Sequence, residues 1–196
     1  HVADRNRFAI FRSKPDGTDM FVLFGAQSRG NSYLHPRDMD PRGKFSGQLV
    51  SSLMPLSGTK EGGSLQMIEA QGAQVRATER VLSDGRGLSL FGRATTPFPL
   101  WDGSDRILVA WRPCEVTRNG VVVSCTTLTE AERAELADDT RTMATRANAA
   151  VQDNAPAAYA IYMFNPANQT WLNVAAPPPG FMYTDPIALI ARTEPN

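Results

Sequence analysis

Short apolar segments followed by a polar turn recur along this chain of 196 residues, and they limit its possible folds more than any other feature. Residues 9–17 and 160–168 match at an offset of 151 (160 − 9), and residues 64–72 form a weaker third copy. Each copy leads into a second extended stretch; the three stretches are 20–24, 74–77 and 171–175. Two extended segments joined by a turn that contains Gly or Asn are typical of a β-hairpin.

A second repeat lies upstream of the last two copies. Residues 48–55 align with 106–113 at an offset of 58 (106 − 48), and both are apolar segments that end in Pro. Turn-rich stretches precede them, at 36–43 and at 97–105. Four short strands in about 40–50 residues is the period of a propeller blade. We therefore expect an all-β fold, in which residues 1–196 form a single partial β-propeller domain of about two four-stranded antiparallel blades.

The second repeat unit is longer than the first because it contains an insertion, residues 114–153. Its first part is predicted to be a hairpin that runs from Cys114 to Cys125. Asn119-Gly120 at the centre, between β-rich flanks, favours a type I′ turn. If these two residues form the turn, the residue numbers of any two facing positions on the strands add up to 239 (119 + 120). Because 114 + 125 is also 239, we expect the two cysteines to lie opposite each other and form a disulfide. The alternative is two free thiols in a cytosolic protein, whereas a disulfide indicates a periplasmic or extracellular location.

The second part of the insertion is predicted to be a surface helix over about 130–150. Thr129 and Glu132 have the spacing of a capping box, and the residues that follow are good helix formers. The larger apolar residues of this stretch are Leu136, Met143 and Val151. Because they form only a narrow stripe, we expect a packed insertion without a function of its own, and a partner-binding helix is the alternative.

The charge of the chain gives no reason to expect a polyanionic partner. Twenty Lys and Arg balance twenty Asp and Glu, so neither nucleic acid nor an anionic membrane surface is indicated. No apolar run approaches the roughly 18 residues that a membrane span requires. The expected partner is therefore another protein, or the remaining blades of a longer polypeptide.

The sequence contains no catalytic motif that we can identify. Gly-x-Ser-x-Gly, Gly-x-x-x-x-Gly-Lys and His-Glu-x-x-His are all absent, so we predict no catalytic, cofactor-binding or metal-binding residue. Three alternative sites are copper at His1 and His35, calcium or paired-acid chemistry at Asp38, Asp40, Asp102 and Asp105, and a sugar or other ligand at Trp101, Trp111 and Trp171. Aspartates in turns usually shape the turn, and tryptophans at repeated strand positions usually belong to the core.

Several motifs resemble those of a known group of propellers. They are Asp16-Gly17-Thr18, Gly25-Ala26-Gln27-Ser28, Pro36-Arg37, Gly62-Gly63-Ser64-Leu65, Pro99-Leu100-Trp101-Asp102-Gly103, Leu108-Val109-Ala110-Trp111, Tyr159-Ala160-Ile161-Tyr162, Met182-Tyr183-Thr184-Asp185 and Leu189-Ile190-Ala191-Arg192. Together they resemble bacterial exported proteins related to the propeller domain of the hydrazine synthase alpha subunit, and more distantly TolB-type propellers. The resemblance implies an exported propeller that is one domain of a larger protein, some members of which carry haem on neighbouring domains. The haem-attachment pattern Cys-x-x-Cys-His is absent here, so we expect no cofactor in this chain.

These observations favour a non-catalytic binding or scaffold segment of an exported bacterial protein. One alternative is the propeller part of a haem-dependent oxidoreductase whose cofactor sites lie outside this chain. Another is a structural subunit that assembles through exposed blade edges, with copies of itself as an oligomer or with other subunits. Residues 185–191 look like the first strand of a further blade, which favours completion by further blades or by a partner.

Overall fold

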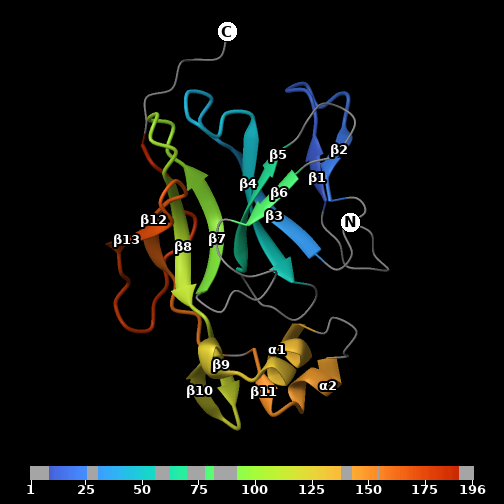
Figure 1. The fold of residues 1–196 in the computed structure, drawn as a ribbon, viewed down its shortest axis with the longest axis vertical. Coiled ribbons are helices and arrows are strands. Elements are labelled where there is room, and N and C mark those ends of the chain that lie inside the picture. The colour runs from blue at the N-terminus through green and yellow to red at the C-terminus, as the bar shows by residue number, and fades with distance from the viewer. Residues whose placement is uncertain are drawn as a thin grey trace.

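Two four-stranded antiparallel sheets account for most of the regular structure in the computed structural model (Figure 1). A two-stranded and a three-stranded sheet accompany them, and the few helical turns lie in one place. The structure describes residues 9–25, 31–55, 62–69, 78–81, 92–137, 143–153 and 155–189. The predicted all-β class is confirmed.

The first four-stranded sheet contains four strands in chain order. They are β3 (Asn31–Asp38), β4 (Gln48–Pro55), β5 (Ser64–Glu69) and β6 (Thr78–Val81). Each strand is antiparallel to the next one along the chain. The strand expected at 74–77 lies outside the described residues, and the last strand of this sheet begins at Thr78.

The second four-stranded sheet has the same order of strands. They are β7 (Gly92–Pro99), β8 (Ile107–Pro113), β12 (Ala160–Asn165) and β13 (Thr170–Ala175). Ser52 of β4 faces Leu65, and the residue 58 positions further on, Ala110 of β8, faces Ile161. The offset of 58 found in the sequence is therefore an offset between structurally equivalent strands.

The first strands of the two sheets correct one prediction. The stretches 36–43 and 97–105 were expected to be turns, but β3 continues through Pro36 and β7 continues through Pro97. The residues before these prolines, His35 and Thr96, have positive φ values of 52° and 47°, and the register of each strand shifts there. Proline is tolerated in such a β-bulge, and on a strand that lies at the edge of its sheet, because no ladder hydrogen bond is lost.

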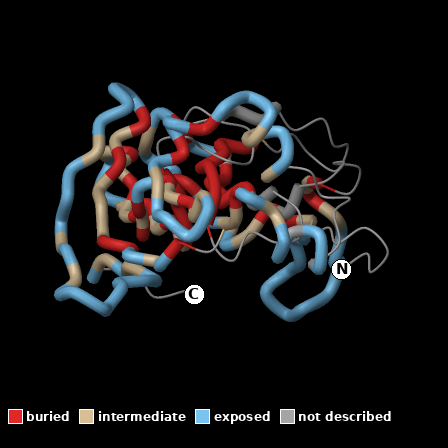
Figure 2. Tube along the Cα trace, turned by 90° about the horizontal axis from the view of Figure 1, so that it is seen from below, coloured by how far each residue is buried: buried red, intermediate tan, exposed pale blue. Residues whose placement is uncertain are grey.

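Three layers of sheet lie face to face, with a core on either side of the first four-stranded sheet. The hairpin of β1 (Ile10–Arg12) and β2 (Phe21–Phe24) forms the outer layer. The core between this hairpin and the first sheet consists of Ile10, Leu23, Tyr33, Leu49, Leu53 and Ile68. The core between the two four-stranded sheets consists of Met39, Phe45, Val50, Leu65, Met67, Ala94, Ile107, Val109 and Phe164. In Figure 2 the buried segments gather in the interior and exposed segments lie around them.

The insertion between β8 and β12 forms a small unit at one end of the molecule (Figure 1). It contains β9 (Glu115–Arg118), β10 (Val121–Ser124), a 3-10 turn (Cys125–Thr127), α1 (Glu130–Ala137), α2 (Met143–Ala147) and β11 (Val151–Gln152). The predicted disulfide between Cys114 and Cys125 is confirmed, with 5.4 Å between the Cα atoms. Asn119 and Gly120 form the turn, with φ values of 50° and 80°. The bridge and a few apolar neighbours give the insertion a core of its own.

The helical part of the insertion is shorter than expected. It consists of α1 and α2, and residues 138–142 between them lie outside the described part of the chain. The capping box is confirmed, because the Glu132 amide donates to Thr129 Oγ1 and the Thr129 amide donates to the Glu132 carboxylate. Val151 was expected on the helix, but it lies in β11, is buried, and pairs with Arg118 of β9. Where the chain is described, no helix is long and apolar enough to cross a bilayer.

A buried ion pair fastens the insertion to the second sheet. The guanidinium of Arg93, on β7, donates two hydrogen bonds to the carboxylate of Asp153, which follows β11. The side chain of Arg93 is 1% exposed and that of Asp153 is 13% exposed. A buried cation without its partner is costly, so this pair fixes where the insertion lies against the sheet.

We predict that Asp153→Ala lowers the free energy of unfolding by about 3–5 kcal/mol, because Arg93 would stay buried without its counter-charge. Denaturant unfolding followed by circular dichroism measures this. The matched control is Lys14→Ala, which breaks an ion pair with Asp19 in which both side chains are more than half exposed. The control should cost less than about 1 kcal/mol. Equal losses in the two variants would contradict the prediction.

Candidate functional site

Two loops at the same end of the two sheets are tied together by a reciprocal pair of aspartates. The loops are 39–47, between β3 and β4, and 100–106, between β7 and β8. The amide of Gly103 donates to the carboxylate of Asp40 at 2.7 Å, and the amide of Lys44 donates to the carboxylate of Asp105 at 2.7 Å. Each loop thus supplies a buried carboxylate to the backbone of the other. We call these two hydrogen-bonded aspartates, with the amides they bind, the loop clasp.

The Asp40 carboxylate also shapes its own turn. It accepts hydrogen bonds from the guanidinium of Arg42 and from the Arg42 amide. Chiefly because of the Arg42 side chain, and also because of the amides of Arg42 and Gly103, the pKa of Asp40 falls to about 2. Asp40 is therefore held in its charged form, in which it accepts four donors at once.

The absence of a side chain at Gly43 allows the hydrogen bond between the Lys44 amide and Asp105. A Cβ atom at Gly43 would overlap the carboxylate of Asp105, so a glycine is needed for the two loops to approach this closely. Asp105 itself has a φ of 58°, a conformation that aspartate tolerates better than most residues. Both features place the loops in contact.

The four aspartates singled out in the sequence do not form one site. Asp40 and Asp105 belong to the loop clasp, whereas Asp102 binds the amide and hydroxyl of Ser104 within its own turn. Asp38 lies apart, on the rim of a groove. In the described part of the chain, no three His, Cys, Asp or Glu side chains gather as metal ligands.

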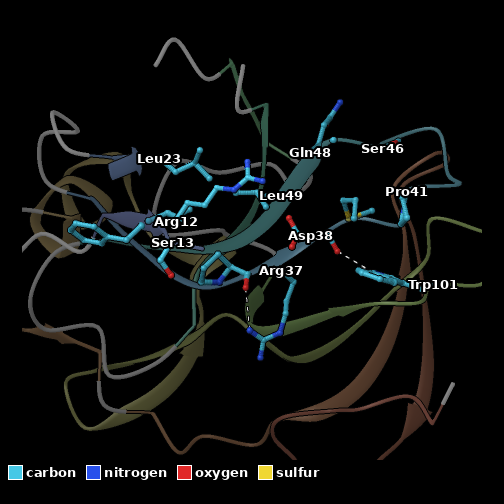
Figure 3. Close-up of a pocket in the computed structure, with 15 residues that line it drawn as sticks. Arg12, Ser13, Leu23, Arg37, Asp38, Pro41, Ser46, Gln48, Leu49 and Trp101 are labelled. Carbon is cyan, nitrogen blue, oxygen red and sulfur yellow. Dashed lines mark hydrogen bonds between the residues drawn. The ribbon is translucent and has the colours of Figure 1, made fainter. Parts of the chain in front are cut away.

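A groove of about 720 Å³ lies between the β1–β2 hairpin and the loop clasp (Figure 3). Its walls come from β1 and β2 on one side, from the end of β3 and the start of β4, and from Trp101 on the other side. The apolar side chains of Leu23, Met39 and Leu49, which belong to the two cores, form part of its lining. The groove therefore lies where one layer of sheet meets the next.

Charged groups line this groove without neutralising each other. Arg12 extends from β1 toward Leu49 and Asp38 in Figure 3, and Arg37 extends in another direction. The Arg37 guanidinium donates to the carbonyl of Pro36, its own neighbour. Neither Arg12 nor Asp38 takes part in a salt bridge with the described residues. The groove thus offers an accessible guanidinium and an accessible carboxylate to a ligand.

Trp101 forms an aromatic wall of the groove and is held by the loops. Its indole Nε1 donates to the carbonyl of Asp38 at 3.2 Å, and its own carbonyl accepts from the Arg42 guanidinium. The side chain remains 38% exposed. A fixed, half-exposed indole beside a cationic group is a common element of protein recognition surfaces.

The other two tryptophans named from the sequence are partly buried and pack against the protein core. Trp111 and Trp171 lie 5.7 Å apart between ring centroids, and both pack against the core between the four-stranded sheets. Trp111 also meets Tyr162, and Trp171 also meets Phe164. Of the three candidates, Trp101 is the one that lines the groove.

The copper alternative is not supported by the described residues. His1 lies outside them, and His35 occupies the bulge of β3 with an exposed side chain. Arg12 and Arg37 were not predicted from the sequence as groove residues. No local signal marks them, because only the packing of the hairpin on the sheet brings them to the same groove.

The groove residues offer polar and apolar groups at its surface, and those described do not include a nucleophile hydrogen-bonded to a base. The lining supplies guanidinium, carboxylate, hydroxyl, amide and indole groups. Comparison of the chain with protein-family models, with curated proteins and with solved structures finds no match. The resemblance to exported propellers therefore stays a prediction from the sequence.

We predict that the loop clasp makes the free energy of unfolding depend on pH in the acidic range. The pKa of Asp40 is about 2 in the folded protein and 3.8 ordinarily, so its contribution is complete above about pH 4 and is lost as the pH falls toward 2. Asp40→Asn should be less stable than wild type at pH 7, and its stability should fall less between pH 4 and pH 2. Thermal unfolding measured across this range tests both points.

The matched control for this experiment is Asp38→Asn, which changes an exposed carboxylate two residues away. Its stability should follow the wild-type pH profile. An Asp40→Asn profile with the wild-type slope below pH 4 would show that Asp40 does not stabilise the fold through its charge.

Proposed function

We propose that this chain is an arc of a β-propeller and acts as a non-catalytic binding or scaffold module of an exported protein. The observation that carries the proposal is the structural repeat. Both four-stranded sheets have the same strand order, the same Xaa-Pro bulge in the first strand, and one shared core between their faces. Small antiparallel sheets stacked face to face in sequence order are the building units of a propeller.

The β1–β2 hairpin supports the same arrangement. In the sequence, its residues match those of the β5 and β12 regions, which begin the outer half of each four-stranded sheet. It packs on the face of the first sheet that is opposite the second sheet. The hairpin therefore takes the place of the outer half of a preceding blade.

We further propose that the groove between the hairpin and the loop clasp binds an extended segment of a partner protein. Arg12 fits an acidic side chain of that segment, because it is exposed and lacks an ion pair within the described structure. Trp101 and the neighbouring apolar lining fit an aliphatic or aromatic side chain. An open groove with mixed polar and apolar walls suits a polypeptide, which can lie along it.

An exported location is supported by the disulfide. Cys114 and Cys125 are both buried in the core of the insertion, and disulfides of this structural kind persist in oxidising compartments. The periplasm or the extracellular space is therefore the proposed location.

The experiment is selection of a displayed random-peptide library on the folded protein, followed by affinity measurement with the synthesised peptides. We expect the selected peptides to combine an acidic residue with an apolar one. Arg12→Gln should weaken their binding by about tenfold or more, since a charge-assisted hydrogen bond contributes about 1.5–3 kcal/mol. Trp101→Ala should weaken it at least as much.

The matched control is Lys14→Gln, which removes a cation from the β1–β2 turn that does not line the groove. Its affinity for the selected peptides should stay within a factor of about two. Peptides whose binding is unaffected by Arg12→Gln and by Trp101→Ala would show that the groove is not the binding site.

A further inference from the structure

Residues 181–189 follow the second sheet as an extended segment that has no strand partner within the described structure. The amide of Tyr183 donates to the carbonyl of Tyr159, directly before β12, at 2.9 Å. The amide of Asp185 donates to Thr96 Oγ1, in the bulge of β7, at 3.2 Å. The segment therefore runs beside the second sheet and next to its first strand.

The segment carries a third copy of the bulge found in β3 and β7. Asp185 precedes Pro186 and has a φ of 51°, as His35 and Thr96 precede prolines with φ values of 52° and 47°. Positive φ at a residue other than glycine is uncommon. Its recurrence before proline in three segments marks them as structurally equivalent.

A hydrogen bond between layers is repeated as well. In β7, the amide of Ala94, two residues before the bulge, donates to the carbonyl of Gly63, which precedes β5. In the final segment, the amide of Tyr183, two residues before Asp185, donates to the carbonyl of Tyr159, which precedes β12. The final segment thus meets the second sheet as β7 meets the first.

The equivalence shows what the final segment lacks. Met39 and Leu100 occupy the same place after their bulges, and their amides donate to Gln48 and Arg106 at the start of the second strand region. Leu189 occupies that place in the final segment (189 − 185 = 39 − 35), and its side chain is 100% exposed where Met39 is 2% exposed. Phe181, Met182 and Ile187 are also exposed.

We propose that residues 181–189 are the first strand of a third sheet, and that their edge, which no described strand occupies, binds an antiparallel β-strand of a partner polypeptide. The second strands already present show the chemistry of this partner. Residues 49–53 of β4 and 107–111 of β8 contain apolar and small residues and no charge. The partner strand is therefore uncharged over about five residues, and main-chain hydrogen bonds supply much of its affinity.

This inference rests on the propeller arc proposed above, but it uses an edge that is separate from the groove. The test uses a fluorescein-labelled peptide with the sequence of residues 106–113, which pairs with β7 inside the chain. Fluorescence anisotropy measures its binding, and hydrogen exchange locates it. We expect saturable binding and amide exchange at 181–189 slowed by about tenfold or more at saturation.

Two proline substitutions make the test specific. Leu189→Pro removes the backbone N–H at the place where the amides of Met39 and Leu100 donate hydrogen bonds. This substitution should therefore abolish the slowed amide exchange at 181–189. Ala188→Pro is the matched control, because β7 has Pro99 at the equivalent place and still pairs with β8 (188 − 185 = 99 − 96). It should bind the peptide as wild type does. Both positions are exposed or partly exposed, so the two sheets should remain folded.

Protection that is confined to 181–189, lost in Leu189→Pro and kept in Ala188→Pro supports the proposal. Absence of binding, or protection at another strand edge, overturns it. Protection of 181–189 without peptide that grows with protein concentration would identify a second copy as the occupant and would also overturn it. Arg12→Gln should leave the binding of this peptide unchanged. The groove proposal and the strand-edge proposal can therefore fail independently of each other.

Discussion

Covering both apolar faces of a small sheet is the constraint on which this structure depends. Along β4, Leu49 and Leu53 pack toward the hairpin, whereas Val50 packs toward the second sheet. In β5, Met67 and Ile68 divide between the two cores in the same way. Full burial of such a side chain contributes about 1.5–3 kcal/mol, so neither face could be left in water without a large cost. A sheet of four strands that is apolar on both sides must therefore have a neighbouring layer on each side.

Layering of this kind also creates the candidate site. Adjacent layers meet along their faces, and the groove lies where the hairpin meets the end of β3 and the start of β4. The polar contacts at the boundaries then decide how the layers are placed. Asp40 and Asp105 lock one loop to the other, and the pair of Arg93 and Asp153 locks the insertion to β7. Apolar contacts supply most of the stability, whereas these directional contacts determine the shape in which a ligand would be bound.

The features that could be predicted from the sequence are those determined by residues close together in the chain. The β1–β2 and β12–β13 hairpins, the disulfide across Asn119-Gly120 and the capping box each depend on a few consecutive positions, and the structure contains these features. The bulges were missed because proline usually ends a strand, whereas here it follows a residue of positive φ on an edge strand. Val151 was misplaced because its burial depends on pairing with β9, more than 30 residues earlier (151 − 118 = 33). The groove could not be predicted, because Arg12, Asp38 and Trp101 meet only through the packing of separate layers.

The position of the insertion has a consequence for how the second sheet is assembled. In the first sheet, eight residues (56–63) separate the second and third strands, whereas in the second sheet the same two strands are separated by 46 residues (114–159). By the usual loop-closure relation, this longer excursion adds about 1.5 kcal/mol of chain entropy to the joining of β8 with β12. Because β11 returns to pair with β9, the compact insertion brings the two ends of the excursion close together before they need to meet. We therefore expect the insertion to act as an internal folding template, whose early formation turns a distant strand pairing into a nearly local one.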